Sequence, residues 1–333
     1  MARVKCVMMQ RDETLLLEPW FRHYGHLFGF ENLVVLDNGS IEPDVLATLD
    51  RYARAGAQVV RGLGRTMDFE AKGQYVRQII EHWDTEEDYD FALPVDCDEF
   101  LATYTAGGLS CARGAIHATL DALIGEQRAM QIRFNPANVP GVAGGFLPMD
   151  FPKKFVARGT VGEVDLGYHA ITSRVAEGFV ETTLAYLHMH NKPFPMLVEH
   201  AARKLRDRVD VTDKKALKSF VGAGMHLIDY FFMTEEDYLA RFANGVFLRF
   251  PGVVNHFGAL GVCNAFFGTL APMEPERPLD LVELVEVVDG QVTRSRPFDA
   301  QAYMALHADV AASDMSAFYH YCAFGMLEGR GIG

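Results

Sequence analysis

The chain has 333 residues, enough for one large catalytic domain with at most a small appendage. Its formal charge of −13 argues against nucleic acid or an anionic membrane as the primary partner. The five cysteines are scattered and form no CxxC pair, which argues against disulfides and cysteine-bound zinc and favours a reducing, cytoplasmic location. No apolar run is long enough to span a membrane, so only a peripheral membrane contact stays open.

Apolar runs and helical patterns alternate through the first hundred residues. We expect helices at 12–28, 43–55 and 68–83, and buried strands at 4–9, 32–36, 57–61 and 91–95. Pro19 should begin or bend the first helix. This alternation predicts an α/β fold with a mixed, mostly parallel sheet and helices on both faces. Ligands of such sheets bind beyond the carboxyl ends of the strands.

After residue 100 the pattern becomes mixed. We expect strands at 129–134, 155–156, 164–171 and 184–190, helices at 112–124, 195–208 and 235–242, and a Gly- and Pro-rich loop at 135–150. A Pro- and Glu-rich linker should begin near residue 271, followed by a hairpin over 281–292 that turns at Asp289-Gly290 and by two short helices in 298–329. We therefore divide the chain into a domain at 1–270 and a small C-terminal hairpin and α-helical module at 280–333.

Acidic residues cluster directly after the fourth expected strand, at Asp96, Asp98 and Glu99. Three carboxylates this close repel one another unless a cation or hydrogen-bond donors offset them, and carboxylate oxygens suit magnesium or manganese. The alternative is a solvated acidic turn, because a bare D-x-D is common. The position after an apolar strand favours a metal site. Cys97 is a poor nucleophile, because the flanking carboxylates raise its thiol pKa.

A second polar cluster, Asp37-Asn38-Gly39-Ser40, ends the second expected strand. Asp37 or Asn38 can accept a hydrogen bond from a base or ribose, and Gly39 permits close approach of a backbone. The alternative is an ordinary turn into the next helix. Because both polar clusters follow strands of one parallel sheet, we expect them at the same edge.

Histidines provide further candidate metal ligands. His188 and His190 are two residues apart, so on a strand they face the same side, and His169 ends another expected strand. Neutral imidazole is a good partner for manganese beside carboxylates. The alternative is a set of ordinary core or surface histidines. Of the three, His188 and His169 are the stronger candidates.

Several long polar side chains are candidates for binding a diphosphate in this acidic protein. The alternative for each one is a solvated surface position. They are Arg11, Lys72, Gln74, Lys153, Lys154 and Lys192.

The order and spacing of these motifs are similar to those of a known family. The segments are Arg11-Asp12-Glu13 with Glu18, His23-Tyr24, Gly29-Phe30, VVLDNGS, DCDEF, KKF, DLGYH and LHMHNKPF ahead of Lys204. Over about residues 3–205 the chain resembles bacterial GT-A glycosyltransferases of the family-2-like class. It departs from their pattern where Arg11-Asp12-Glu13 replaces the usual Asn-Glu and where Lys192-Pro193-Phe194 replaces the common Arg and Ser. The tail resembles a short helical module of bacterial polysaccharide-related glycosyltransferases.

The resemblance implies transfer of a sugar from a nucleotide diphosphate, with UDP as the commonest, to a hydroxyl of a glycan or lipid acceptor, with inversion. The implied metal ligands for Mn²⁺ or Mg²⁺ are Asp96, Asp98 and His188. The implied nucleotide-sugar contacts are Arg11, Asp37, Asn38, Lys72 and Asp96. Further contacts are expected at His169, His190 and Lys192, and Asp165 or Glu99 is the expected base. The alternatives are a metal-dependent nucleotide-diphosphate hydrolase and a non-catalytic nucleotide- or glycan-binding subunit.

Overall fold

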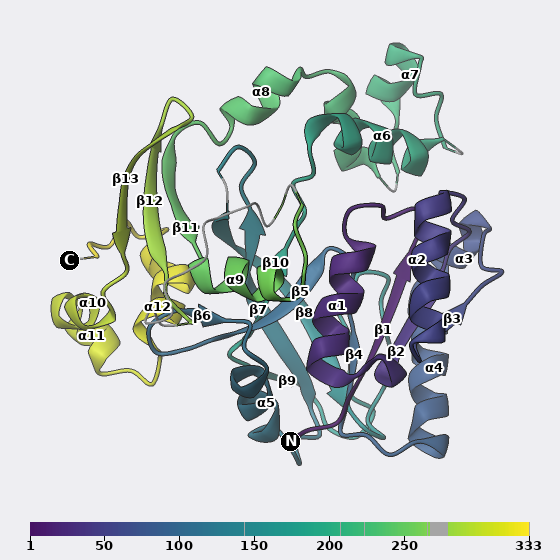
Figure 1. Cartoon of the computed structure of the whole chain (residues 1–333), viewed down its shortest axis with the longest axis horizontal. Helices are drawn as coiled ribbons and strands as arrows, with labels where there is room; N and C mark the ends of the chain where they lie inside the picture. The colour runs from purple at the N-terminus through teal and green to yellow at the C-terminus, as the bar shows by residue number, and fades with distance from the viewer. Residues whose placement is uncertain (143, 207, 223, 265, 267–278, 333) are drawn as a thin grey trace.

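A computed structural model describes the chain apart from residues 143, 207, 223, 265, 267–278 and 333 (Figure 1). Most of the linker expected from residue 271 lies outside the described residues. No described helix is both long enough and apolar enough to cross a membrane.

Four parallel strands form the N-terminal part of the sheet. Their order is β3-β2-β1-β4, with bounds β1 (Val4–Gln10), β2 (Leu33–Asp37), β3 (Gln58–Val60) and β4 (Phe91–Pro94). Gln10 pairs with Asp37, and Val7 pairs with Pro94. The carboxyl ends of these strands therefore share one edge, and the expected common location of the two polar clusters is confirmed.

Helices cover both faces of the parallel strands. Side chains alternate along β1, so that Cys6 and Met8 join one apolar cluster and Val7 and Met9 join another. The first cluster includes residues of α1 (Leu17–Phe28) and α2 (Pro43–Arg54). The second includes residues of α4 (Lys72–Glu86). The expected α/β architecture, mostly parallel at its core, is confirmed.

The helix boundaries follow from local chemistry. Pro19 lies in the first turn of α1, where its missing N–H costs no helix bond. The single helix expected at 68–83 is wrong in extent, because α3 (Thr66–Glu70) and α4 are separate, and the Asp68 carboxylate accepts from the Arg65 backbone N–H at the start of α3. A Cβ on Gly73 would lie 2.2 Å from the Val164 carbonyl oxygen, so only glycine lets α4 approach that turn.

Strands in both parallel and antiparallel pairings extend the sheet beyond β4. They are β5 (Glu99–Tyr104), β6 (Leu109–Ser110), β7 (Ala129–Asn138), β8 (Gly145–Ala157), β9 (Phe179–Glu181) and β10 (Leu184–His188). β8 runs antiparallel to both β4 and β7, while β10 pairs in parallel with β7 and antiparallel to β5.

Two sequence expectations are wrong in this region. The Gly- and Pro-rich segment 135–150 is mostly strand, because β7 and β8 pair along it despite the prolines. The strand expected at 164–171 is a turn in which Tyr168 has a positive φ of 61° and Asp165 accepts from the backbone N–H groups of Gly167 and Ala170. These local bonds replace a strand ladder.

The segment after β10 adds mainly short elements: α6 (Phe194–Leu205), α7 (Lys214–Ser219), η2 (Met225–Phe231), α8 (Glu235–Ala240), β11 (Gly245–Arg249) and α9 (Pro251–Ala259). Helices α6, α7 and α8 lie together at the upper edge in Figure 1, beyond the body of the sheet. The other short helices of the chain are η1 (Phe30–Asn32) and α5 (Arg113–Asp121).

The C-terminal hairpin forms as predicted from β12 (Glu283–Val288) and β13 (Gln291–Pro297), with the turn at Asp289-Gly290. β12 pairs with β11, which pairs with β8, so the hairpin continues the main sheet. Four short helices follow instead of two: α10 (Ala300–Leu306), α11 (Ala308–Ala311), α12 (Ala317–His320) and η3 (Tyr321–Gly325). The Tyr319 ring packs 5.2 Å from that of Tyr104. The domain boundary between 270 and 280 stays a prediction.

Candidate metal and nucleotide site

Strand pairing brings the acidic turn after β4 to the end of β10. His188 lies opposite Glu99 in the antiparallel register of β10 and β5. The backbone N–H of Met189 donates to the Asp98 carbonyl at 2.7 Å, which fixes the two segments together. The carboxyl edge of the sheet therefore holds both the acidic turn and the paired histidines.

Asp98, His188 and His190 form a group with metal-ligand spacing. One candidate ligand atom from each side chain lies within 4.8 Å of the other two. Nε2 of His188 is 3.5 Å from Oδ2 of Asp98, and the two imidazole rings are 5.2 Å apart. His190 thus joins Asp98 and His188, two of the three ligands expected from the sequence, while Asp96 is not in the group.

The donor set of this group suits manganese better than magnesium. One carboxylate and two imidazoles offer one oxygen and two nitrogens, whereas Mg²⁺ prefers oxygen throughout. Burial alone would raise the pKa of Asp98, but the adjacent His188 and the nearby Lys192 hold it well below its usual range. Burial would lower the pKa of His188, and Asp98 raises it above its usual value instead. The Asp98 carboxylate is therefore ionised, and its negative charge would attract a metal cation.

His169 lies outside this group and contacts Pro152 and Phe151 instead. Its Nδ1 lies 2.6 Å from the Pro152 carbonyl oxygen, and its ring packs against Phe151 at 4.7 Å. Phe151 also contacts the His188 ring at 5.6 Å, so the two histidines share an aromatic neighbour. His169 is not among the three clustered ligands.

Two buried lysines hold Asp96. Lys72 Nζ and Lys153 Nζ lie 2.9 and 2.7 Å from its two carboxylate oxygens. Lys153 also lies 3.0 Å from Glu99, whose side chain is 1% exposed. Burial would raise the pKa of Asp96, but the two lysines lower it strongly, so this carboxylate stays ionised. Its role as a metal ligand stays a prediction, and its side chain is 27% exposed, which leaves it accessible to a ligand.

A buried tyrosine packs against the same lysines. The Tyr168 ring centroid lies 4.2 Å from Lys72 Nζ and 5.7 Å from Lys153 Nζ. Its hydroxyl is buried and has no hydrogen-bond partner among the described residues. Buried hydroxyls without partners are uncommon in native structures, so the Tyr168 hydroxyl calls for a specific explanation, such as a bound water, an ion or a catalytic role. Tyr168 also has the positive φ noted above, which is strained for a bulky residue.

The second polar cluster is tightly bonded within its own turn. The Asp37 carboxylate accepts from Gln10 Nε2 at 3.0 Å and from Ser40 Oγ at 2.6 Å, while the Asn38 amide donates to the Leu63 carbonyl. Gly39 has a φ of 78°, and a Cβ there would lie 2.7 Å from Gly64 Cα. These contacts fit the ordinary-turn alternative, and base or ribose binding by Asp37 and Asn38 stays a prediction.

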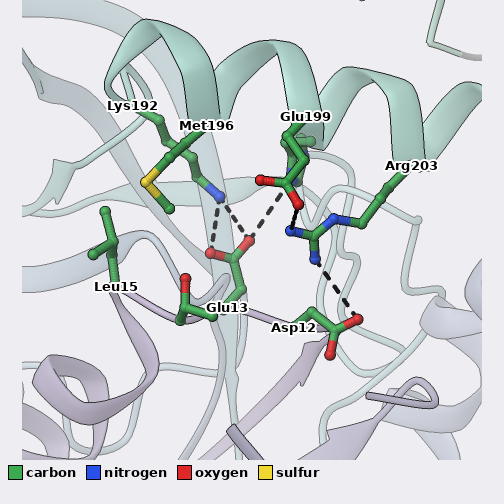
Figure 2. Close-up of a pocket in the computed structure, with 9 residues that line it drawn as sticks. Asp12, Glu13, Leu15, Lys192, Met196, Glu199 and Arg203 are labelled. Atoms are coloured by element: carbon green, nitrogen blue, oxygen red, sulfur yellow. Dashed lines mark hydrogen bonds and ion pairs between the residues drawn. The ribbon is translucent and has the colours of Figure 1, made fainter. Parts of the chain in front are cut away.

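The loop after β1 is tied to α6 by ion pairs (Figure 2). Lys192 Nζ lies 2.7 and 2.8 Å from the two oxygens of Glu13, and both side chains are largely buried. Arg203 lies 3.6 Å from Asp12 and 2.9 Å from Glu199. Together with Met196 and His200, these side chains line a small hollow between the loop and the helix.

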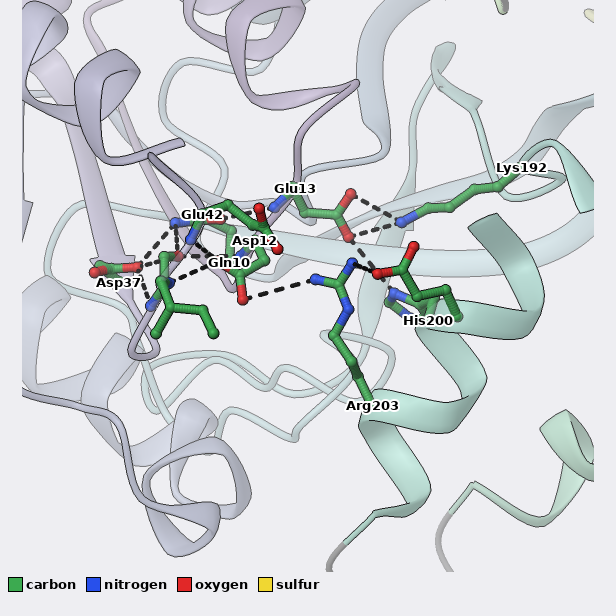
Figure 3. Close-up of polar contacts among 11 residues, drawn as sticks. Gln10, Asp12, Glu13, Asp37, Glu42, Lys192, His200 and Arg203 are labelled. Atoms are coloured by element: carbon green, nitrogen blue, oxygen red, sulfur yellow. Dashed lines mark hydrogen bonds and ion pairs between the residues drawn. The ribbon is translucent and has the colours of Figure 1, made fainter. Parts of the chain in front are cut away.

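Asp12 connects this network to the turn after β2, which holds the second polar cluster, Asp37–Ser40 (Figure 3). Its carboxylate accepts from the backbone N–H groups of Ile41 and Glu42 at 2.8 and 3.0 Å, and its own N–H donates to Ser40 Oγ. The end of β1, the turn after β2 and helix α6 are thus joined through one side chain. Arg11 lies exposed on the same loop.

His200 is electrostatically distinct from the metal-site histidines. Burial, with help from Lys192 and Lys204, lowers its pKa to about 3. It therefore stays neutral at physiological pH, and its Nδ1 lies 4.0 Å from Glu13.

The two expected bases differ in accessibility. Burial would raise the pKa of Asp165, but backbone donors at Ala170, His169 and Gly167 lower it. Burial raises the pKa of Glu99 despite Lys153, and its Oε2 accepts from the Asp96 N–H. Asp165 is half-buried and Glu99 is fully buried. The role of either residue as a base stays a prediction.

Sequence reasoning missed Arg203, His200 and Tyr168 as members of this site. A signal for two of them exists: Met196, His200 and Arg203 follow the i, i+4, i+7 spacing of one helix face. Tyr168 gives no such signal. It lies in a turn, whereas the apolar pattern of residues 164–171 predicts a strand.

No family model and no curated protein matches the chain. Among solved structures, residues 1–349 of S. aureus TarS match at 10% identity and a TM-score of 0.33, covering 72% of this chain and 73% of that one. Mannosyl-3-phosphoglycerate synthase from Rubrobacter xylanophilus matches at 13% identity and a TM-score of 0.28, covering 89% of each chain. Against a longer TarS structure the match spans only 21% of that chain. At these TM-scores the similarity carries no argument about function.

Proposed function

We propose that the protein is a manganese-dependent glycosyltransferase that moves a sugar from a nucleoside-diphosphate sugar, with UDP-sugars as the first to test, to a hydroxyl of a glycan or lipid. The observation that carries this proposal is the Asp98, His188 and His190 group at the carboxyl edge of a parallel sheet. That edge is where sheets of this kind bind nucleotides.

The chemistry of glycosyl transfer explains why such a group is needed. The difficult step is departure of the diphosphate as negative charge develops on its oxygen. A bound Mn²⁺ would supply a Lewis acid at that oxygen. Asp98 and the two imidazoles would hold the ion. Asp96, kept ionised by Lys72 and Lys153, would accept hydrogen bonds from the ribose or the sugar.

The cations between the loop after β1 and α6 would receive the phosphates. Lys192 contributes to lowering the pKa of Asp98, so the two groups are close enough to interact. Lys192 lies just before α6, and Arg203 on α6 lines the same hollow. For direct displacement with inversion we propose Asp165 as the base, because it is more accessible than Glu99.

Melting temperatures with UDP, GDP, dTDP and CDP, each with and without Mn²⁺, test the binding half of the proposal. A ligand that binds only the folded state stabilises it by about 2.7 kcal/mol at a hundredfold excess over Kd. We expect one nucleotide to raise the melting temperature only when Mn²⁺ is present. Asp98→Asn should abolish this shift, while Asp150→Asn, an exposed aspartate paired with Arg133, should retain it. A shift that survives in Asp98→Asn would remove the proposed metal site.

Release of nucleoside diphosphate from sugar donors tests the catalytic half. We expect release to rise when a hydroxyl acceptor is added. Equal release with and without every acceptor tried would indicate a hydrolase. Metal-dependent binding with no release would indicate a non-catalytic subunit.

A further inference from the structure

One short segment of this acidic protein carries a local excess of positive charge. Residues 203–218 contain seven Lys or Arg and three Asp, a net charge of +4 in a chain of −13. The segment spans the end of α6 and most of α7.

Arg203 and Arg208 of this segment pair with carboxylates outside it, whereas the lysines of α7 have exposed side chains. Asp210 accepts from the N–H and hydroxyl of Thr212, and Asp213 caps α7 by accepting from Lys215 and Ala216 N–H groups. These carboxylates are therefore engaged by local backbone. Lys214, Lys215 and Lys218 are all exposed.

Apolar side chains adjoin these lysines at the surface. Val221 is 85% exposed, Met225 53% and Phe232 38%. Lys214 Nζ and Lys218 Nζ lie 5.9 and 5.2 Å from the Phe232 ring centroid, so these two lysines and Phe232 share one surface. The local core consists of other residues, which are Ala201, Leu205, Leu217, Leu227 and Ile228. The three exposed side chains are therefore not needed to complete it.

We propose that α7, residues 219–222, η2 and Phe232 form a docking surface for an anionic lipid bilayer. Lysines attract the headgroups, and the apolar side chains enter the boundary between headgroups and acyl chains. A soluble polyanion would account for the lysines but not for Val221, Met225 and Phe232. The bilayer is therefore the partner that fits both kinds of side chain.

The acidic remainder of the chain does not prevent this contact. The Debye length is about 8 Å at physiological ionic strength, so charges on distant faces are largely screened. Attraction then depends on the charges nearest the membrane, where the exposed Lys214, Lys215 and Lys218 outnumber the exposed Asp229 of η2. In Figure 1, α6 and α7 lie together at the edge of the molecule, away from the C-terminal hairpin and helices. The uneven charge would therefore orient the protein with this edge toward the bilayer. This inference does not depend on the proposed sugar transfer.

Co-sedimentation of the full chain with vesicles tests the proposal. Vesicles of phosphatidylcholine with about 30% phosphatidylglycerol, enough for a negative surface potential, should bind the protein, and pure phosphatidylcholine should not. Lys214→Gln, Lys215→Gln and Lys218→Gln together should weaken binding on the order of 100-fold. Val221→Ser with Met225→Ser should weaken it roughly tenfold. Added salt should release the wild type.

The matched control removes the same charge elsewhere, with Arg54→Gln, Arg61→Gln and Arg294→Gln, all at exposed positions. This control should bind like the wild type, and all variants should melt like it. Equal binding to neutral and anionic vesicles, or an equal loss in the control, would overturn the proposal. A loss confined to the lysine variant, with the apolar variant unchanged, would overturn the bilayer in favour of a polyanion.

Discussion

Nε2 of His188 lies 3.5 Å from Oδ2 of Asp98, although one residue ends β10 and the other follows β4. The antiparallel pairing of β10 with β5 produces this contact, because β5 begins directly after the acidic turn. His190, two residues after His188, is the third member of the group. The proposed chemistry depends on these three side chains acting as one site.

His190→Ala should weaken Mn²⁺ binding by at least about 10- to 100-fold, as removal of a metal-supporting group commonly does. The fold should be unaffected, because His190 is exposed. Calorimetric titration of Mn²⁺ in the presence of UDP measures the change. His82→Ala, at an exposed position on α4, is the control and should titrate like the wild type. Equal affinity in the two variants would exclude His190 from the site.

Lys192→Met should destabilise the protein by about 3 kcal/mol, because it leaves the Glu13 carboxylate largely buried without its cation. His200 cannot substitute, since its pKa of about 3 keeps it neutral. Adding Glu13→Gln to Lys192→Met should restore part of the loss. Urea denaturation of both single variants and the double variant gives the coupling free energy, expected at about 0.5–3 kcal/mol. Strictly additive losses would show that the two residues do not form a stabilising pair.

Stability should fall as the pH decreases from about 6.5 toward 4 because of the buried histidine pair His23 and His256. Their ring nitrogens lie 3.0 Å apart. Burial and the neighbouring His26 lower the pKa of His256 to about 4, and burial lowers that of His23 as well. Between these pH values the histidines are protonated in the unfolded chain but still neutral in the folded protein. Lowering the pH therefore favours the unfolded state.

For His256 alone, the loss in the free energy of unfolding approaches about 3 kcal/mol near pH 4. His256→Gln should flatten the dependence of unfolding free energy on pH, measured by urea denaturation at successive pH values. Unchanged pH dependence in the variant would contradict the low pKa of His256. The window lies above the ordinary aspartate pKa, so carboxylate titration contributes less there.

The parallel half of the fold could be predicted from the sequence because its strands are short apolar runs with polar residues at their ends. Asp37 and Asp96 could be placed at one edge on that basis alone. The β7–β8 hairpin could not be predicted from the sequence, because Pro136 and Pro148 are typical of a loop. The segment is strand because the two halves of the hairpin pair with each other.

The site could be predicted only in part. The two-residue spacing of His188 and His190 indicated a common side, but their contact with Asp98 depends on strand order. The lysines that hold Asp96 come from α4 and β8, so no local pattern links them to the acidic turn. Tyr168 depends on a strained turn whose apolar residues suggest a strand.

Gly73→Ala should destabilise the protein by roughly 1–3 kcal/mol, because its Cβ would meet the Val164 carbonyl oxygen at 2.2 Å. Gly114→Ala, on α5, has nothing within 4 Å of the new Cβ and should stabilise by about 0.5 kcal/mol. Thermal denaturation distinguishes the two. A neutral Gly73→Ala would show that the approach of α4 to the 164–165 turn is not tight.

Pulsed electron paramagnetic resonance of Mn²⁺ bound together with UDP tests the central claim most directly. The account predicts nitrogen couplings from imidazole ligands and phosphorus couplings from the nucleotide in the wild type, and loss of this bound species in Asp98→Asn. A bound Mn²⁺–UDP complex without imidazole coupling, or one unchanged in Asp98→Asn, would contradict it.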